Sequence, residues 1–429
     1  MGQYAIYFDL SGMSREEMEY LMLTSNYRMQ MDTSDHSAEE LYRLLGEYIS
    51  GGNFGLCYPN SGAGENHRPM LSITWEGLTK DFDASLDLIL EMYTQIDFSD
   101  LDMLSYLTKA SADYWDMSRQ DPGDIAYYYA HRGAGLSADT NRFMLDVNGQ
   151  DCYYLIADAV RRLQDEEGFA VKLAAQLESA VRKAFTRENL IFMSVTGNDD
   201  NDAIIAHAVD RLNALPEKEG TDAEYALPNV PKKMAICVES TMNESYLVAD
   251  CLDDADFLGS YLPFWYALSD LYTVPTFRFQ LGAYGGYNFY ESQGYLTTRI
   301  YSDPNVRATV EALDRMPQAL YDMELTEENL NGYILKAYSD MTSPQGVLKD
   351  VMIAMVLDVY GADAERIHAI THGICSGKPP LVFCSSATCN VEQPVLNWVI
   401  IRSVYSLDDH GSGEQYVCCL LVLRRQYSF

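Results

Sequence analysis

The stretch that decides the fold is FDASLDLILEMYTQIDF, residues 82–98, because its pattern returns in TVEALDRMPQALYDMEL, residues 309–325. In the first copy, apolar side chains recur at the spacing of one helix face: Leu86, Ile89, Tyr93 and Ile96. In the second copy the same steps, each 227 positions further along, hold Leu313, Met316, Leu320 and Met323. A register kept through a whole stripe predicts two copies of one domain.

Local signals around the two stripes agree with a duplication. Ser99 and Thr326 occupy corresponding positions, and each is expected to cap the helix that follows. A glycine pair opens a short segment in each copy, GGNF at 51–54 and GGYNF at 285–289. Pro317 lies inside the second stripe and is expected to kink or shorten that helix. The predicted fold class is α+β, with two homologous domains that each contain an antiparallel sheet and helices on one face.

The composition of the chain changes along its length. A polar stretch with Pro216, Pro228 and Pro231 indicates a linker between the two repeats. From Cys375 onward the helical periodicity is lost, and this part holds five of the nine cysteines at spacings that match no zinc finger. We expect this tail not to complete the second domain. The predicted organisation is a first repeat at 1–213, a linker at 214–232, a second repeat at 233–375 and an atypical cysteine-rich tail at 376–429.

The charge of the chain limits its partners. Lys and Arg number 30 against 63 Asp and Glu, which gives a formal net charge of -33. Such an excess of negative charge argues against nucleic acid and against an anionic membrane as partners. The first ten residues lack a basic region followed by an apolar run, so no signal peptide is expected, and the cytoplasm is the expected location. Nine cysteines at scattered positions indicate no disulfide framework, which fits a reducing compartment.

The sequence contains no convincing catalytic motif. The segment HSAEE at 36–40 begins like an inverted zinc motif but has glutamate in place of the second histidine, so we interpret it as a helix start. His368 and His372 are one helical turn apart, yet no glutamate lies between them and no third ligand is identifiable. There is neither a G-x-S-x-G elbow nor a phosphate loop. We therefore predict no metal site and no complete catalytic centre in this chain.

One glycine-rich stretch is the candidate functional site, FRFQLGAYGGYNF at 277–289. Phe277 and Phe279 alternate with polar residues, which predicts a strand with both aromatic rings on one face. The glycines that follow allow a sharp turn or a close approach of another segment. On these residues alone the stretch is interpreted as a glycine-rich hairpin, and a ligand site at Arg278 and Tyr284 is the less favoured alternative.

Several segments resemble the C-terminal half of a presequence-protease-type zinc metallopeptidase, in the pitrilysin and insulinase superfamily. They are YAIYFDLS at 4–11, GQDCYYL at 149–155 and ENLIFMSVTG at 188–197. The most specific match is Arg278 followed by LGAYG at 281–285, similar to the family's arginine, glycine pair, alanine, tyrosine and glycine. Leu281 replaces the first glycine of that pair and is expected to stiffen the turn. The resemblance extends over residues 3–372.

The resemblance implies a mitochondrial processing peptidase-like metallohydrolase fold and a missing partner. In such enzymes a zinc-bearing N-terminal half and a C-terminal half close around a chamber. By resemblance, Arg278 and Tyr284 hold the substrate backbone and support the oxyanion that develops at the metal. The substrate-binding turn would be formed by Gly282, Ala283, Gly285 and Gly286. No cofactor is expected in this chain, and zinc is expected in the partner half, which would come from the same gene or from a separate subunit.

The implied substrates are unfolded peptides, and an acidic chamber wall would favour basic ones. A function of another class stays open as the alternative, a catalytically silent peptide-binding or scaffolding protein that has lost its partner. An upstream segment or a neighbouring gene that encodes H-x-x-E-H would favour the peptidase half, and its absence would favour the scaffold.

Overall fold

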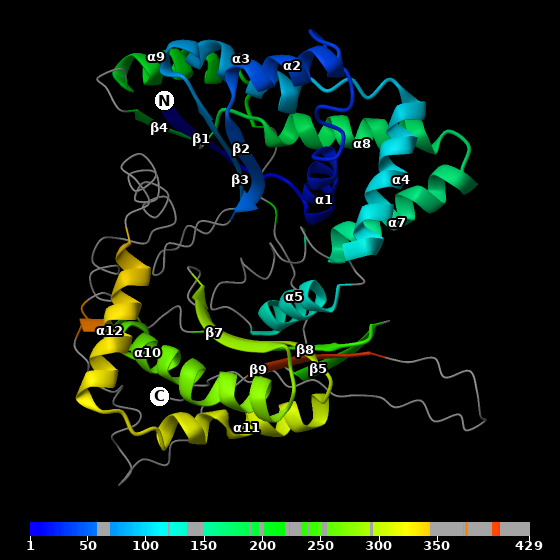
Figure 1. Ribbon diagram of the computed structural model, residues 1–429. Coiled ribbons are helices and arrows are strands. Elements are labelled where there is room, and N and C mark those ends of the chain that lie inside the picture. Colours follow the sequence, from blue (N-terminus) through cyan, green and yellow to red (C-terminus); the bar gives the residue numbers. More distant parts are fainter. Residues whose placement is uncertain are drawn as a thin grey trace. The chain divides into compact units, whose positions relative to one another are not determined.

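The computed structural model forms two compact units (Figure 1). It describes residues 1–57, 69–118, 121–134, 147, 150–188, 190–196, 201–218, 223, 233–238, 240–250, 255–291, 295–343, 372, 374–375 and 397–403. The first unit holds the described residues within 1–116 and 143–227, and the second holds those within 117–142, 228–343 and 362–429. Each unit combines a sheet with helices, so the predicted α+β class is confirmed.

The first unit is built on a four-stranded sheet in the order β2-β3-β1-β4, with each neighbouring pair antiparallel. Its strands are β1 (Gly2–Asp9), β2 (Gly51–Cys57), β3 (Met70–Gly77) and β4 (Ile191–Thr196). Alternate side chains of β1, among them Tyr4, Ile6 and Phe8, lie in one core with the helices. Ile6 is paired with Ile73 of β3 on one side and with Phe192 of β4 on the other. One face of β1 therefore carries the core of this unit.

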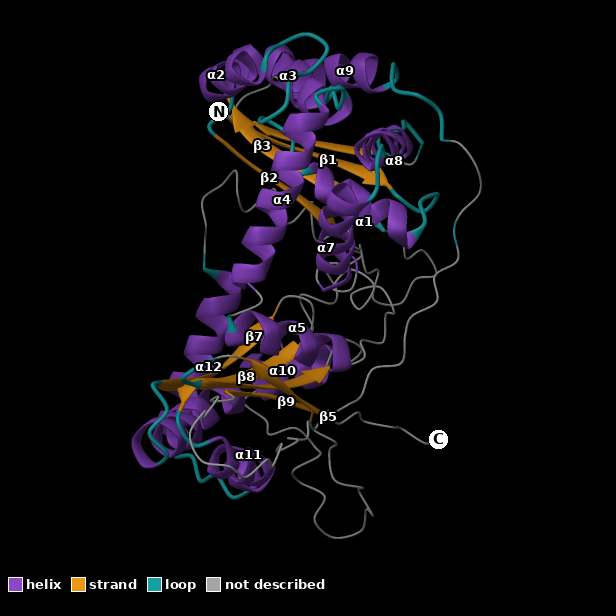
Figure 2. Cartoon of the chain, turned by 90° about the vertical axis from the view of Figure 1, so that its right-hand side faces the viewer, coloured by secondary structure: helices purple, strands orange, loops and turns teal. Residues whose placement is uncertain are grey.

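The helices of the first unit pack on that core. They are α1 (Arg15–Thr24), α2 (Ala38–Tyr48), α3 (Phe82–Thr94), α4 (Leu101–Ser118), α7 (Gln150–Asp165), α8 (Phe169–Ala184) and α9 (Asn201–Leu212), with a 3-10 turn η1 (Thr79–Asp81) before α3. Figure 2 shows α2, α3 and α9 along one side of the strands. The predicted stripe on α3 is buried, since Leu86 is fully enclosed and Ile89 is 3% exposed. Removal of these apolar side chains from water holds the helix on the sheet.

The second unit contains a five-stranded sheet in the order β5-β9-β6-β8-β7. Its strands are β5 (Lys233–Val238), β6 (Asn243–Asp250), β7 (Gly285–Glu291), β8 (Tyr295–Asp303) and β9 (Asn397–Ser403). The pair of β5 and β9 is parallel, which departs from the purely antiparallel sheet that we predicted, and the other pairs are antiparallel. Strand β9 comes from the tail that we expected to leave this domain incomplete, and the structure instead places it between β5 and β6.

Helices cover both faces of the second sheet, whereas the sequence predicted helices on one face. They are α5 (Pro122–Ala134), α10 (Ala255–Leu268), the π-helical segment η2 (Ser269–Gln280), α11 (Val306–Tyr321) and α12 (Glu327–Thr342). Leu247 of β6 lies in the core that contains α10 and α11, while Tyr246 and Val248 pack with Ala126 and Ala130 of α5. Successive side chains of a strand point to opposite faces. Figure 1 accordingly shows α5 on the other side of the strands from α10 and α11.

The second helix stripe is buried like the first. Leu313 of α11 is fully enclosed and Met316 is 1% exposed. Pro317 does not end α11, which continues to Tyr321. The expected shortening of this helix by proline is therefore not observed.

The helix caps agree with the sequence at one of two corresponding positions. Thr326 caps α12 as predicted, since its Oγ1 accepts a hydrogen bond from the backbone N–H of Asn329 at 3.2 Å. At α4 the predicted cap, Ser99, is wrong by one residue. The side chain of Asp100 accepts the N–H of Met103 at 2.9 Å, because its carboxylate lies at the position from which the first turn is reached.

Candidate functional site

The segment that carries Arg278 is helical, so the predicted strand is wrong. Residues 269–280 form the π-helical segment η2. Residues two positions apart lie on opposite sides of a helix but on the same face of a strand. Accordingly, Phe277 is fully buried while Phe279 is 74% exposed. The aromatic pair that suggested a strand is divided between the core and the surface.

A tight turn follows η2 and depends on one glycine. Gly282 has a φ of 85°, a left-handed conformation that disfavours any side chain. Leu281, which replaces a glycine of the resembling signature, has a φ of -97° and therefore fits without backbone strain. The backbone N–H of Ala283 donates to the carbonyl oxygen of Phe277 at 2.9 Å, and Ala283 is 3% exposed. The inner side of the turn is thereby fixed to η2.

The structure brings Arg278 and Tyr284 together at the surface. The Cζ atom of Arg278 lies 5.9 Å from the ring centroid of Tyr284 and 5.9 Å from that of Phe279. Tyr284 is 68% exposed. Its backbone N–H donates to the carbonyl oxygen of Ser302 at 3.2 Å. A fixed main chain with exposed side chains suits a pair that binds a ligand from solvent.

Gly285 and Gly286 begin the edge strand β7 and pack closely on β8. A Cβ at Gly286 would lie 2.7 Å from Cδ1 of Ile300, and one at Gly285 would lie 2.3 Å from the hydroxyl of Tyr301. Further along β7, the buried Asn288 accepts a hydrogen bond from Thr273 of η2 at 3.2 Å. The two glycines therefore serve the packing of β7, which in turn supports the clamp pair.

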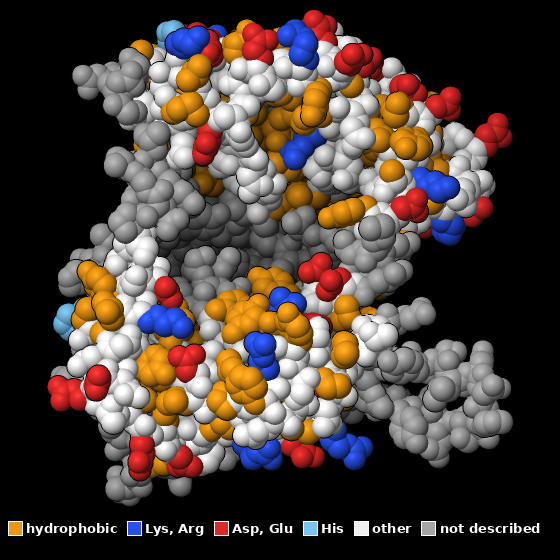
Figure 3. Space-filling model, viewed as in Figure 1, with side chains coloured by type: hydrophobic (Ala, Val, Ile, Leu, Met, Phe, Trp, Pro, Cys, Tyr) orange, Lys and Arg blue, Asp and Glu red, His pale blue; other side chains and the backbone are white. Residues whose placement is uncertain are grey.

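Aromatic rings extend from Tyr284 along the sheet. Ring centroids are 5.6 Å apart for Tyr284 and Tyr301, 5.9 Å for Tyr287 and Tyr301, and 5.4 Å for Tyr287 and Phe289. Tyr287 and Phe289 share one face of β7, and Tyr287 is 38% exposed. We call these four residues the aromatic surface: Tyr284, Tyr287, Phe289 and Tyr301. Figure 3 shows hydrophobic side chains gathered with Lys and Arg side chains on the face of the second unit that is turned to the viewer.

Sequence reasoning missed an ion pair beside the aromatic surface. Nη2 of Arg299 lies 3.4 Å from Oε2 of Glu244. Cζ of Arg299 also lies 5.3 Å from the ring centroid of Tyr301 and 5.5 Å from that of Tyr246. Burial raises the pKa of Glu244, although the N–H of Ser302 and the charge of Arg299 act in the opposite direction. The only sequence signal was a charge inside an apolar run, because the partner carboxylate lies 55 positions away.

The other candidate residues form no metal site within the described ranges. Nδ1 of His36 lies 2.9 Å from Oε1 of Glu91, and Ser37 caps α2, which confirms the segment as a helix start. His368 lies outside the described residues, and with it the proposed pair with His372. Among the described His, Cys, Asp and Glu side chains, no group of three or more is arranged to hold a metal. In the same part of the chain, no helix is long and apolar enough to span a membrane.

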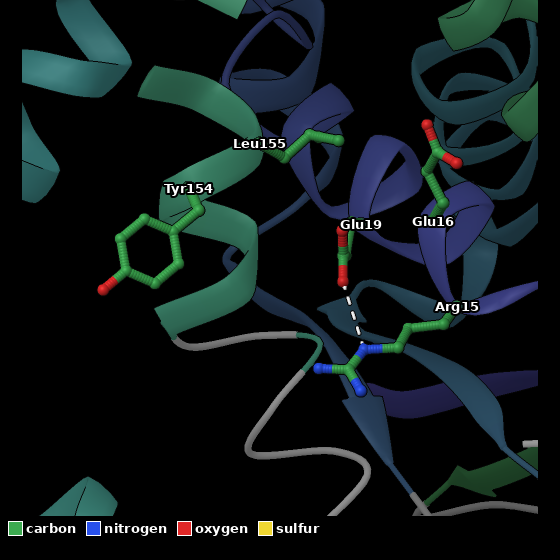
Figure 4. A pocket seen from close by; sticks show the side chains of 5 residues that line it. All are labelled: Arg15, Glu16, Glu19, Tyr154 and Leu155. Carbon is green, nitrogen blue, oxygen red and sulfur yellow. Dashed lines mark hydrogen bonds and ion pairs between the residues drawn. The ribbon is translucent and has the colours of Figure 1, made fainter. Parts of the chain in front are cut away.

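A pocket in the first unit contains a helix ion pair. It encloses about 500 Å³ and is lined by Arg15, Glu16, Glu19, Tyr154 and Leu155. Nε of Arg15 lies 3.4 Å from Oε1 of Glu19, one helical turn further along α1, and Tyr154 points away from this pair (Figure 4). Such pairs are typical of the solvated face of a helix. The stretch around Arg278 and Tyr284 therefore stays the candidate site.

Comparison with known proteins gives a family for part of the chain. Residues 3–140 match the family model described as the associated region of peptidase M16, subfamily C. Protein HypA of Clostridium perfringens is 20% identical over 400 residues, in a match that covers 84% of this chain and 38% of that protein. The chain thus spans about two fifths of the length of this curated relative.

Two similar solved structures show the fold of the whole chain. The peptidase M16 inactive domain from Pseudomonas fluorescens is 14% identical, with a TM-score of 0.63 over 94% of this chain and 92% of that one. The periplasmic protease PqqL from Escherichia coli is 12% identical, with a TM-score of 0.59 over 94% of this chain and 43% of that one. The predicted resemblance to a C-terminal, non-zinc half is confirmed at the level of family and fold: residues 3–140 are a region associated with subfamily C of the M16 peptidases, and the chain has the fold of a peptidase M16 inactive domain.

Proposed function

We propose that this chain is the non-zinc half of a peptide-degrading metalloendopeptidase, and that Arg278 and Tyr284 clamp the substrate opposite a zinc ion held by the partner half. The observation that carries the proposal is the pairing of these two side chains, with Cζ of Arg278 5.9 Å from the ring centroid of Tyr284 at the surface. Both side chains extend from a turn whose main chain is fixed by hydrogen bonds.

The chemistry of the pair suits peptide hydrolysis. A guanidinium group donates in a planar fork and can bind the carbonyl oxygens of an extended peptide. A phenol can donate to the oxyanion that develops when water attacks a peptide carbonyl. Because the backbone of Tyr284 is hydrogen-bonded to Ser302, the hydroxyl would reach substrate with little loss of freedom. The zinc and its general base would lie in the partner half.

The partner and the substrates follow from the same proposal. HypA of Clostridium perfringens is longer than this chain by more than half of its length, so a zinc-bearing half has room in such a protein or in a separate subunit. The net charge of -33 favours unfolded, basic peptides as substrates. We retain the presequence-protease type and a cytoplasmic location as parts of the proposal.

A duplicated origin of the two units is also proposed. Read from the glycine-led edge strand, the first sheet runs β2-β3-β1-β4 and the second runs β7-β8-β6-β9, followed by β5. In both sheets the edge strand begins with two glycines and the buried helix stripe comes after the next strand. This correspondence supports the 227-position repeat of the sequence.

Reconstitution tests the clamp. The chain is mixed with a zinc-bearing M16 half, and cleavage of a quenched fluorescent peptide is followed. Arg278→Ala is expected to lower turnover by about ten-fold or more, which is about 1.4 kcal/mol of transition-state stabilisation. Arg307→Ala, at an exposed arginine of α11, is the matched control and should leave turnover unchanged. A mixture that cleaves no faster than the zinc half alone refutes the proposed function.

A catalytically silent peptide-binding protein is the second candidate, and the aromatic surface favours it. Exposed aromatic rings such as Tyr284 and Tyr287 bind peptides without any need for catalysis. Anisotropy of a labelled peptide, measured on the chain alone and with the zinc half, separates the two candidates. Binding without any gain in cleavage would favour the silent protein.

A further inference from the structure

The backbone beneath Tyr284 contains an irregularity in the sheet. The register of β6 and β8 shifts between Asn243 and Ser245. One residue of β6, Glu244, therefore faces two residues of β8, Tyr301 and Ser302. Ser302 has a φ of 50°, in the left-handed region that side chains other than that of glycine rarely adopt. Some contact of the surroundings must support this conformation.

The carboxylate of Glu244 supplies that contact. Its Oε1 accepts a hydrogen bond from the backbone N–H of Ser302 at 3.0 Å. Its Oε2 lies 3.4 Å from both Nε and Nη2 of Arg299. Glu244 is 8% exposed, so water competes little for either oxygen. A bulge leaves the N–H of its extra residue without a ladder partner, and the carboxylate fills this position.

The other end of the same peptide segment contacts the clamp. The carbonyl oxygen of Ser302 accepts the backbone N–H of Tyr284 at 3.2 Å. The neighbouring ring of Tyr301 lies 5.6 Å from the ring of Tyr284, centroid to centroid. A change in the backbone of Ser302 would therefore move both the main-chain anchor and the ring support of Tyr284.

We propose that Glu244 is a positioning residue for Tyr284: it holds Ser302 in the left-handed conformation, and Ser302 in turn fixes the backbone of Tyr284. The link to peptide turnover rests on the proposed function, whereas the link to the backbone of Tyr284 does not. Glu244 touches no substrate in this arrangement. It acts through two hydrogen bonds in series, from β6 to β8 and from β8 to the turn.

Amide hydrogen exchange of the full chain tests the structural link. Glu244→Asp keeps the negative charge but shortens the reach to Ser302, and it should raise the exchange rate of the Tyr284 amide about ten-fold or more. Glu244→Gln keeps an acceptor oxygen without the charge, and it should stay within about two-fold of the natural chain. Glu311→Ala, at an exposed carboxylate of α11, is the control and should change nothing. Protection in the Asp variant and loss in the Gln variant would overturn the proposal, because the ion pair with Arg299 would then be the operative contact.

A rescue variant tests the left-handed conformation itself. Glycine adopts a positive φ without a steric penalty. Ser302→Gly in the Glu244→Asp background should therefore slow the exchange of the Tyr284 amide again. An exchange rate that stays as fast as in Glu244→Asp alone would show that Glu244 does not support the backbone of Ser302, and the proposal would fail.

Turnover in the reconstituted peptidase tests the consequence for the clamp. Glu244→Asp should lower turnover when Tyr284 is present and should have no further effect in a Tyr284→Phe background. An equal loss in both backgrounds would show that Glu244 does not act through Tyr284. If Tyr284→Phe alone leaves turnover unchanged, the proposed function of the clamp is what fails, and the exchange result at Tyr284 still decides the structural link.

Discussion

The left-handed conformation of Gly282 gives a prediction whose magnitude follows from the structure. An alanine at this position would meet no obstruction, since the nearest heavy atom to its Cβ is Cγ of Pro304 at 3.7 Å. Packing therefore contributes little, and backbone strain decides the outcome. A φ of 85° costs a side chain roughly 1–2 kcal/mol. Alanine also restricts the unfolded chain, which returns about 0.4–1 kcal/mol. Gly282→Ala should thus lower the stability of the second unit by about 1 kcal/mol.

A second glycine of the same unit provides a control of opposite sign. Gly332 lies within α12, and a Cβ there would meet no heavy atom within 4 Å. Gly332→Ala should stabilise the unit by about 0.5–1 kcal/mol, because alanine is the better helix former. Gly282→Asn should fall between Gly282 and Gly282→Ala, because asparagine tolerates the left-handed region.

The assay is hydrogen exchange of the β7 and β8 peptides at increasing urea concentration, which reports the free energy of unfolding of the second unit. If Gly282→Ala and Gly332→Ala stabilise the unit by similar amounts, Gly282 does not have a positive φ and the described turn is wrong. A large loss with Gly282→Asn would also contradict the argument, because it would indicate steric exclusion at this position.

Two further predictions use contrasts within the chain. Phe277→Ala should cost the second unit about 3–5 kcal/mol, whereas Phe279→Ala should change its stability by less than about 0.5 kcal/mol; equal losses in urea titrations would favour the strand over η2. In the first unit, the hydrogen bond to Glu91 raises the pKa of His36. The stability that this pair contributes is therefore fully present below the ordinary pKa of 6.5 and is lost as the pH rises through the raised value, so His36→Asn should flatten the pH dependence of unfolding measured by β1 and β3 exchange.

The sequence predicted those features that depend on neighbouring residues. The stripes on α3 and α11 were visible because a helix face repeats within one or two turns, and both are buried as expected. The strand predicted at Phe277 failed because two alternating aromatic residues fit a strand face as well as two sides of a helix. The ranking was decided by tertiary packing, which encloses Phe277 and leaves Phe279 in solvent. No local pattern carries that information.

The support of Tyr284 could not be predicted for a different reason. Its parts come from β6, β8 and the turn after η2, and the bulge that joins Glu244 to Ser302 exists only once the strands have paired. Likewise, α5 lies within the predicted first repeat by sequence, but its Ala126 and Ala130 pack on β6 of the second unit. Both contacts join segments far apart in the chain, for which a single sequence offers no register.

Three departures from regular backbone meet at Tyr284, and their coincidence favours a functional reading of this turn. The π-helical segment η2 ends four residues before it, Gly282 has a positive φ two residues before it, and Ser302, with a φ of 50°, accepts its N–H. Each departure costs free energy that regular structure would avoid, and such features persist where the surroundings specify them. A turn needed only to connect η2 to β7 would not require the left-handed serine on β8. A tyrosine whose hydroxyl must be held at a fixed point would require it, which is why Glu244 and Tyr284 should be tested as one device.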